Sequence, residues 1–229
     1  MMRWLGARLF SIGTSLLVLA VGVVPRMAAA TQCPNGAGGG EALAGLDGEL
    51  RLRWIDARLT TTAEHARLWT WGWGIGIVGG TLANLAPLPF VAKQDRIDWY
   101  VGAGTTIVGI VPLIIAPLDV VEDARELHAR VAGGAGRASS PPALCALLAD
   151  AETRLVRDAQ NQADGQRWWL HAGNVLLNSG VGLFLALGYR HYVAGVFNAV
   201  FGSAIGEAII LTQPTGSIDD LAAYRRGAI

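Results

Sequence analysis

The stretch LWTWGWGIGIVGGTLANLAPLPFVA, residues 68–92, contains no charged side chain over 25 positions. A helix of roughly 20 apolar residues is long enough to cross a bilayer core about 30 Å thick. Three further stretches are as long and nearly free of charge: residues 99–118, 168–189 and 192–213. Lipid offers the backbone no hydrogen-bond partner, so stretches of this length are expected to be helices. The sequence therefore predicts an all-α integral membrane protein with four transmembrane helices in two hairpins.

The composition agrees with a membrane protein. Only 16% of the 229 residues are charged, while 52% are hydrophobic; soluble domains carry about 25% charged residues. Basic and acidic residues number 18 each, and no basic run suits a phosphate backbone. Nucleic-acid binding is therefore excluded, and the lipid bilayer is the expected surrounding.

The N-terminus resembles an export signal. Arg3 and Arg8 precede a mostly apolar run over residues 9–24, and Ala28 and Ala30 occupy the positions of an A-x-A cleavage site. Residues 1–30 are predicted to be a signal peptide that is removed before Thr31. An uncleaved anchor is the alternative. Either reading places Thr31 on the periplasmic side of a bacterial inner membrane.

This orientation fixes the expected topology. The turn at residues 93–98 faces the cytoplasm, whereas the segment 119–167 and the C-terminus face the periplasm. Positive charge at both inner turns agrees with the positive-inside rule, but several arginines near the outer ends of the spans do not. Aromatic residues at the ends of spans are interpreted as depth markers of the membrane interface: Trp69, Trp71, Trp73, Trp99, Tyr100, Trp168 and Trp169.

The chain reads as two similar halves. Residues 31–132 and 143–229 are joined by a linker rich in Gly, Ser and Pro at residues 133–142. Each half begins with a polar, Arg-rich helix, at residues 50–67 and 143–167, and continues with two spans. An internal repeat of this kind would relate the halves by an axis along the membrane normal. The alternative is that any two membrane hairpins look alike.

Cys33 and Cys145 are the only two cysteines, and both are expected on the oxidising side of the membrane. Two cysteines in an exported chain favour one disulfide between them. An intermolecular bond or two free thiols are the alternatives.

Small residues recur at a spacing of four in the first and last spans. Such positions line one helix face and allow close approach of two backbones, either within the molecule or in a homo-oligomer. The glycines at these positions are Gly72, Gly76, Gly80, Gly195, Gly202 and Gly206.

Polar side chains inside the predicted spans are the best functional candidates. A carboxylate within a span is rare and usually faces protein or water. Such a group suggests a proton or cation site, and interhelical hydrogen bonds are the structural alternative. The candidates are Glu207, His171, Asn174, Asn178, Asn198 and Asn84.

An acidic segment follows the second span. Carboxylates three and four residues apart on one helix face could bind a divalent cation, although a solvated face partly paired with Arg125 and Arg130 is the favoured interpretation. The acidic residues are Asp119, Glu122, Asp123 and Glu126. No cofactor is expected.

Three functions follow from these patterns. The first is a non-catalytic structural or assembly component that contacts a membrane protein partner, or a second copy, through its outer helices. The second is a small transporter or channel with a polar path around Glu207. The third is a membrane enzyme that uses the outer carboxylates. The chain has no H-E-x-x-H, C-x-x-C, G-x-S-x-G or phosphate-loop motif, and the enzyme hypothesis therefore ranks third.

Overall fold

The computed structural model describes residues 31–115, 118–135 and 140–229. The predicted signal peptide, residues 1–30, lies outside the described residues. Within them, every regular element is a helix, apart from one isolated bridge between Gln32 and Asp47. The all-α prediction is confirmed.

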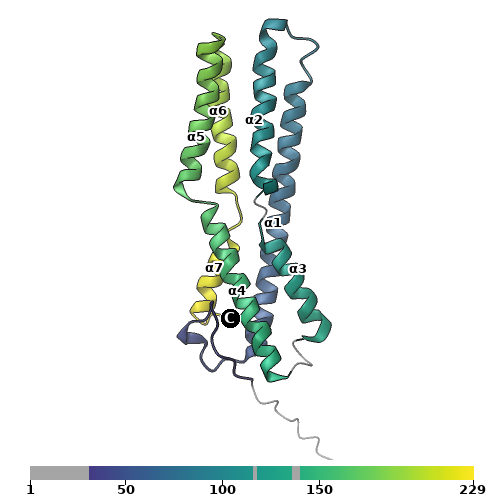
Figure 1. Ribbon diagram of the computed structural model, residues 1–229, viewed down its shortest axis with the longest axis vertical. Coiled ribbons are helices and arrows are strands. Elements are labelled where there is room, and N and C mark those ends of the chain that lie inside the picture. Colours follow the sequence, from purple (N-terminus) through teal and green to yellow (C-terminus); the bar gives the residue numbers. More distant parts are fainter. Residues whose placement is uncertain (1–30, 116–117, 136–139) are drawn as a thin grey trace, which may run out of the picture.

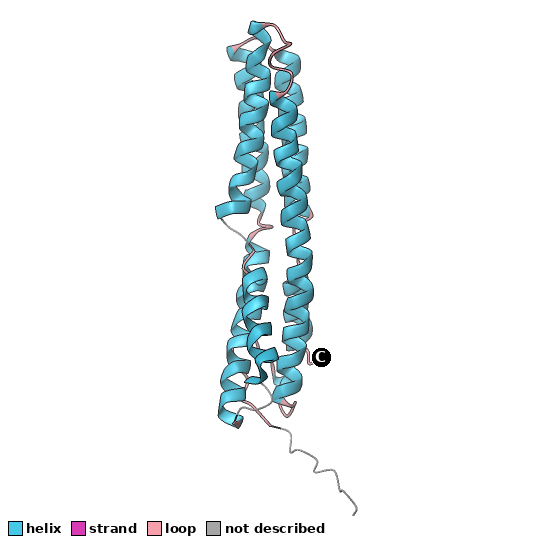
Figure 2. Ribbon diagram, turned by 90° about the vertical axis from the view of Figure 1, so that its right-hand side faces the viewer, coloured by secondary structure: helices cyan, strands magenta, loops and turns pink. Residues whose placement is uncertain are grey.

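The described residues form seven α-helices that run nearly along the long axis of a rod (Figures 1 and 2). They are α1 (Gly48–Leu85), α2 (Arg96–Ile115), α3 (Val120–Arg130), α4 (Pro141–Asp164), α5 (Trp168–Leu183), α6 (Tyr192–Leu211) and α7 (Gly216–Arg225). Four short helical turns accompany them: η1 (Glu41–Leu43), η2 (Lys93–Asp95), η3 (Val131–Ala135) and η4 (Phe184–Gly188).

The first long helix, α1, continues without a break from the predicted polar helix into the first predicted span, and it ends at Leu85, seven residues before the predicted end of that span. The Asp47 side chain caps its N-terminus by accepting a hydrogen bond from the Glu49 amide at 2.9 Å. No glycine or proline occurs between residues 49 and 71. At 1.5 Å per residue, its 38 residues extend about 57 Å.

The corresponding part of the second half is broken. Helix α4 ends at Asp164, and α5 begins at Trp168 after an extended Arg167. A side chain at Gly165 would collide with Gln213 in the loop between α6 and α7. The break therefore packs against that loop, and a larger residue at position 165 would require the Gln213 side chain to move.

The rod has two regions with different surfaces. The first, here called the polar half, comprises residues 48–67 of α1 together with α3, α4 and α7, and its helices enclose a continuous hydrophobic core. Fully buried members of this core come from all four helices: Leu52, Ile55, Leu59, Leu127, Leu148, Leu155 and Tyr224.

The second region, here called the apolar half, comprises residues 68–85 of α1 together with α2, α5 and α6. Almost all large hydrophobic side chains that are exposed in the described residues lie here, in its turns or at its ends; Leu50 is the exception. Two helical stretches, Pro141–Gly188 and Tyr192–Arg225, are long and apolar enough to cross a membrane. The α1 part of the first hairpin is less hydrophobic, because ten of the thirteen residues from 69 to 81 are Gly, Thr or Trp.

Close backbone approach holds α5 against α6. A Cβ atom at Gly195 would lie 2.5 Å from the Gly182 carbonyl oxygen, and one at Gly182 would lie equally close to Gly195. Among the other predicted packing glycines, Gly202 and Gly206 lie against Asn178 and Asn174, and Gly80 is near Thr106. Gly72 and Gly76 have open space at their Cβ positions.

The two hairpins of the apolar half meet mainly at their ends. Near the polar half, the indole N–H groups of Trp69 and Trp73 both donate to Thr212 Oγ1, at 3.2 and 3.0 Å. At the far end, His191 Nδ1 lies 2.7 Å from Asp98 Oδ1. Polar contacts thus tie α1 and α2 to α6 at both ends of this region.

A disulfide and a buried polar network close the other end of the rod. Cys33 and Cys145 are joined as the cysteine count predicts, with Cα atoms 5.2 Å apart, which ties the N-terminal segment to the start of α4.

The network beside the disulfide connects α1, α4 and α7. Arg51 is ion-paired with Glu152, and its Nε donates to the Tyr224 hydroxyl at 2.9 Å. Tyr224 in turn donates to Glu152 at 2.6 Å, and the Gly36 amide donates to the other Glu152 oxygen at 2.7 Å. Arg51, Glu152 and Tyr224 are fully buried, and each charged group has the partners that burial demands.

Candidate functional site

Four of the predicted polar residues come together between α5 and α6. His171 Nδ1 lies 2.5 Å from Glu207 Oε2, and Asn174 donates to Glu207 Oε1 at 2.9 Å. The Asn174 amide also donates to the Ser203 carbonyl at 2.9 Å. Asn178 donates to both oxygens of Asn174, at 2.9 Å each. We call His171, Asn174, Asn178 and Glu207 the polar ladder.

The local sequence explains this arrangement. His171, Asn174 and Asn178 are three and four residues apart, so they lie on one face of α5. Opposite them on α6 stand Gly202 and Gly206, whose missing side chains leave room for the two asparagines: a Cβ at either glycine would overlap an asparagine oxygen. The glycine spacing noted in the sequence therefore serves the polar residues directly.

The ladder faces away from the first hairpin. Thr212 points toward α1, since it accepts hydrogen bonds from Trp69 and Trp73. Glu207 precedes Thr212 by five residues, which is about 140° around a helix. The side chains of His171 and Glu207 are 31% and 28% exposed. They open onto the outer surface of the α5–α6 pair, not into the space between the hairpins.

The other two candidates lie elsewhere. Asn198 precedes Glu207 by nine residues, about 180° around α6, so it lies on the opposite face of this helix. Asn84 belongs to the first hairpin, where its amide donates to the Gly80 carbonyl at 2.8 Å and its oxygen packs against Gly102.

The chemistry available to the ladder is proton or cation binding at its exposed end. A histidine and a carboxylate in contact can hold a variable number of protons, and a carboxylate can attract a cation. The ladder is short, however. His171 and Asn178 are seven residues apart, which is about 10 Å along a helix axis, a third of a bilayer core of about 30 Å.

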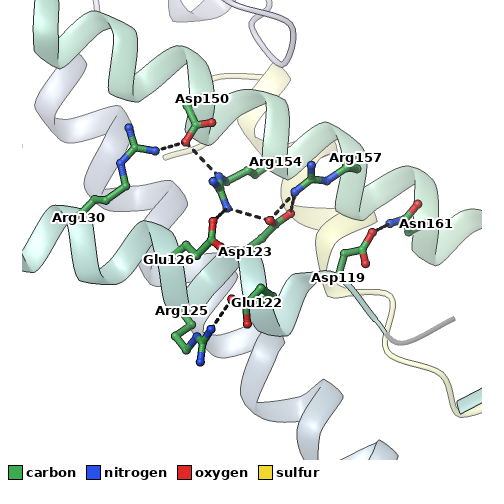
Figure 3. A network of polar contacts seen from close by, with 10 residues as sticks. All are labelled: Asp119, Glu122, Asp123, Arg125, Glu126, Arg130, Asp150, Arg154, Arg157 and Asn161. Carbon is green, nitrogen blue, oxygen red and sulfur yellow. Dashed lines mark hydrogen bonds and ion pairs between the residues drawn. The ribbon is translucent and has the colours of Figure 1, made fainter. Parts of the chain in front are cut away.

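The predicted acidic face is engaged by arginines from another helix (Figure 3). Arg154 of α4 lies 2.8 Å from Asp123 and 2.9 Å from Glu126, and Arg157 is ion-paired with Asp123. Of the remaining acidic residues, Glu122 is paired with Arg125 on its own helix, and Asp119 accepts a hydrogen bond from Asn161. The described residues contain no group of three or more His, Cys, Asp or Glu side chains arranged to hold a metal ion.

Two details differ from the solvated face that the sequence favoured. Asp123 is buried, and its partners come from α4, more than thirty positions away. Arg130 pairs with Asp150 of α4 at 2.7 Å instead of with the acidic face. Sequence reasoning missed Asp150, Arg154 and Arg157 because their spacing within α4 gives no sign of which helix they meet.

Sequence reasoning also missed the pair of Arg51 and Glu152, because these residues are 101 positions apart and belong to no motif.

No protein-family model, curated protein or solved structure matches the chain.

Proposed function

We propose that this chain is an integral membrane protein with four spans that serves as a non-catalytic structural or assembly component. In this proposal, residues 68–85 of α1, α2, α5 with the turn after it, and α6 cross the bacterial inner membrane. The polar half stands in the periplasm. The exposed apolar side chains of one half and the closed core of the other support this division.

One observation carries the proposal: α1 is a single helix shared by both halves. Of its length of about 57 Å, a bilayer core takes up about 30 Å, so the rest holds the polar half clear of the membrane. The disulfide and the network around Arg51 fix the polar half as one body. Several of its carboxylates, those of Asp123, Glu126, Glu152 and Asp220, are paired with arginines, which supports a docking surface over a catalytic one.

The test is isolation from native membranes in a mild detergent, followed by intact-complex mass and identification of co-purifying chains. We expect a stoichiometric partner protein or a second copy. Charge reversal of exposed positions on the outer helices, as in Arg53→Glu together with Arg167→Glu, should release the partner. Glu207→Gln is the matched control and should retain it. A chain that remains monomeric in every mild detergent contradicts the proposal.

A second candidate function rests on the half-exposed pair of His171 and Glu207. A proton- or cation-coupled transporter would use this pair as its binding site, and a second subunit would have to complete the path. Reconstituted liposomes with an internal pH indicator test this candidate. Glu207→Gln should stop the flux, whereas Asn198→Leu, on the opposite face of α6, should not. Unchanged flux in Glu207→Gln removes the candidate.

A further inference from the structure

Asp158 of α4 is a buried carboxyl group that has no hydrogen-bond donor. Only 1% of its surface is exposed, and neither carboxylate oxygen has a hydrogen-bond partner in the described part of the chain. Gln162, one turn further along, is equally buried but exchanges two hydrogen bonds with Ser217 of α7. An ionised carboxylate without a donor is costly in a protein interior, so Asp158 requires either a counter-charge or a proton.

The neighbour of Asp158 is another carboxyl group, Asp123 of α3. Asp123 is buried and already engages both Arg154 and Arg157 (Figure 3). These arginines make their hydrogen bonds to Asp123, Asp150 and Glu126 and none to Asp158. A protonated Asp158 would have an O–H group to donate, and Asp123 is the acceptor beside it.

The surrounding charges favour the protonated form. Burial raises the pKa of Asp158 to about 8, the negative charges of Asp123 and Asp119 on α3 add to this rise, and Arg157 on α4 opposes it. On the other two packed helices, the charged groups at this level are Arg58 of α1 and Asp220 of α7, and they are paired with each other.

We propose that a proton shared by Asp158 and Asp123 latches α3 to α4 and so joins the first half of the chain to the second. Helix α3 packs mainly on α1 and meets α4 through the charged side chains of Figure 3. Loss of the proton leaves two adjacent buried carboxylates at this contact, and the contact loosens. In the periplasmic orientation proposed above, the latch responds to the pH of the medium.

The sign of the effect follows from the raised pKa. The latched state binds one proton more than the open state at every pH between the ordinary pKa of aspartate, about 4, and the value of about 8 in the fold. The stabilisation is therefore complete below the lower value and is lost as pH rises through the upper one. Within this window, the opening equilibrium should increase by about tenfold per pH unit.

Hydrogen exchange of α3, residues 120–130, in the purified full-length protein measures this opening once intrinsic exchange rates are divided out. We expect the pH slope in the native chain and its loss in Asp158→Asn, whose amide donates to Asp123 without titrating. Asp150→Asn is the matched control, since Asp150 is a more exposed carboxylate of the same network, and it should keep the slope. A slope that persists in Asp158→Asn, or is absent from the native chain, overturns the proposal.

An infrared measurement tests the proton without any variant. Native protein labelled with ¹³C-carboxyl aspartate should show the carbonyl band of a protonated aspartic acid at pH 7, and the band should disappear above about pH 9 as the group ionises. The label separates Asp158 and Asp123 from every glutamate, including Glu207. Absence of the band at pH 7 refutes the shared proton, even if the variants do not fold.

Discussion

The polar half and the apolar half are both built from antiparallel helices, but their side chains are arranged in opposite ways. The polar half places Leu, Ile and Tyr inside and most of its charges outside, whereas the apolar half places Leu, Val and Phe outside and Gly, Asn and Thr between helices. Water rewards burial of apolar surface. Lipid does not, so helices there are held by close contact and interhelical hydrogen bonds. This difference supports the proposal that the apolar half lies in lipid and the polar half in water.

The charged groups in the two halves also differ. In the polar half, Arg51 and Glu152 are buried completely and share hydrogen bonds with three further residues, Cys33, Gly36 and Tyr224, so the network connects the N-terminal segment, α1, α4 and α7. In the apolar half, His171 and Glu207 remain partly exposed. The first arrangement suits a fixed structure, and the second leaves a group accessible to a partner or a proton.

Breaking the buried network should give the largest effect. Glu152→Ala leaves the Arg51 charge buried without its partner, and we expect the polar half to lose about 3–5 kcal/mol in unfolding free energy. Glu49→Ala, which removes an exposed ion pair with Arg53 on the same helix, should cost less than about 0.5 kcal/mol. Denaturant unfolding followed by far-UV circular dichroism measures both. Equal losses would mean that the buried network does not hold the polar half together.

Two leucine-to-alanine substitutions test the opposite arrangement of apolar side chains in the two halves. Leu155 is 0% exposed in α4, and Leu176 is 72% exposed in α5. Leu155→Ala should cost about 2–5 kcal/mol through lost contacts and a cavity. Leu176→Ala should leave unfolding in detergent nearly unchanged, because its side chain contacts the surrounding detergent and not the protein. A loss at Leu176 as large as that at Leu155 would show that α5 packs against protein on its outer face.

The smallest expected effect concerns helix contact in the apolar half. Gly195→Ala places a methyl group against the Gly182 backbone, and such overpacking costs about 1–3 kcal/mol. Gly76→Ala is the control, since its Cβ position is open. Titration with sodium dodecyl sulfate, followed by tryptophan fluorescence, compares the two. A destabilised Gly76→Ala would instead reveal a neighbouring chain on that face of α1.

Much of the fold follows from local sequence. Three of the four predicted spans match helical segments to within three residues at either end, whereas the first was predicted to reach residue 92 and α1 ends at Leu85. The sequence predicted polar helices at residues 50–67 and 143–167 but not whether they continue into the spans: α1 continues through Trp69, whereas α4 stops at Asp164. Gly165 marks that stop in the sequence, but its contact with Gln213 does not appear there.

The candidate site was also predicted in part from local sequence. His171, Asn174 and Asn178 share a face by their spacing alone, and Glu207 completes the ladder as expected. The direction in which the ladder faces depends on how two hairpins pack, and no local pattern carries that information. Asp158 illustrates the limit further: it stands among the charged residues of α4, and only the packed structure distinguishes it as buried and without a donor.

The polar half and the apolar half are connected by a continuous helix on one side and by loops on the other, and this difference has a mechanical consequence. On one side, α1 is an unbroken helix, so a tilt of residues 68–85 moves residues 48–67 by the same angle. On the other side, α5 and α6 meet α4 and α7 through two short loops that lie side by side, at residues 165–167 and 212–215. The second hairpin is therefore joined to the polar half by two loops and not by a continuous helix. A displacement of one end of the molecule is therefore transmitted to the other end mainly through α1.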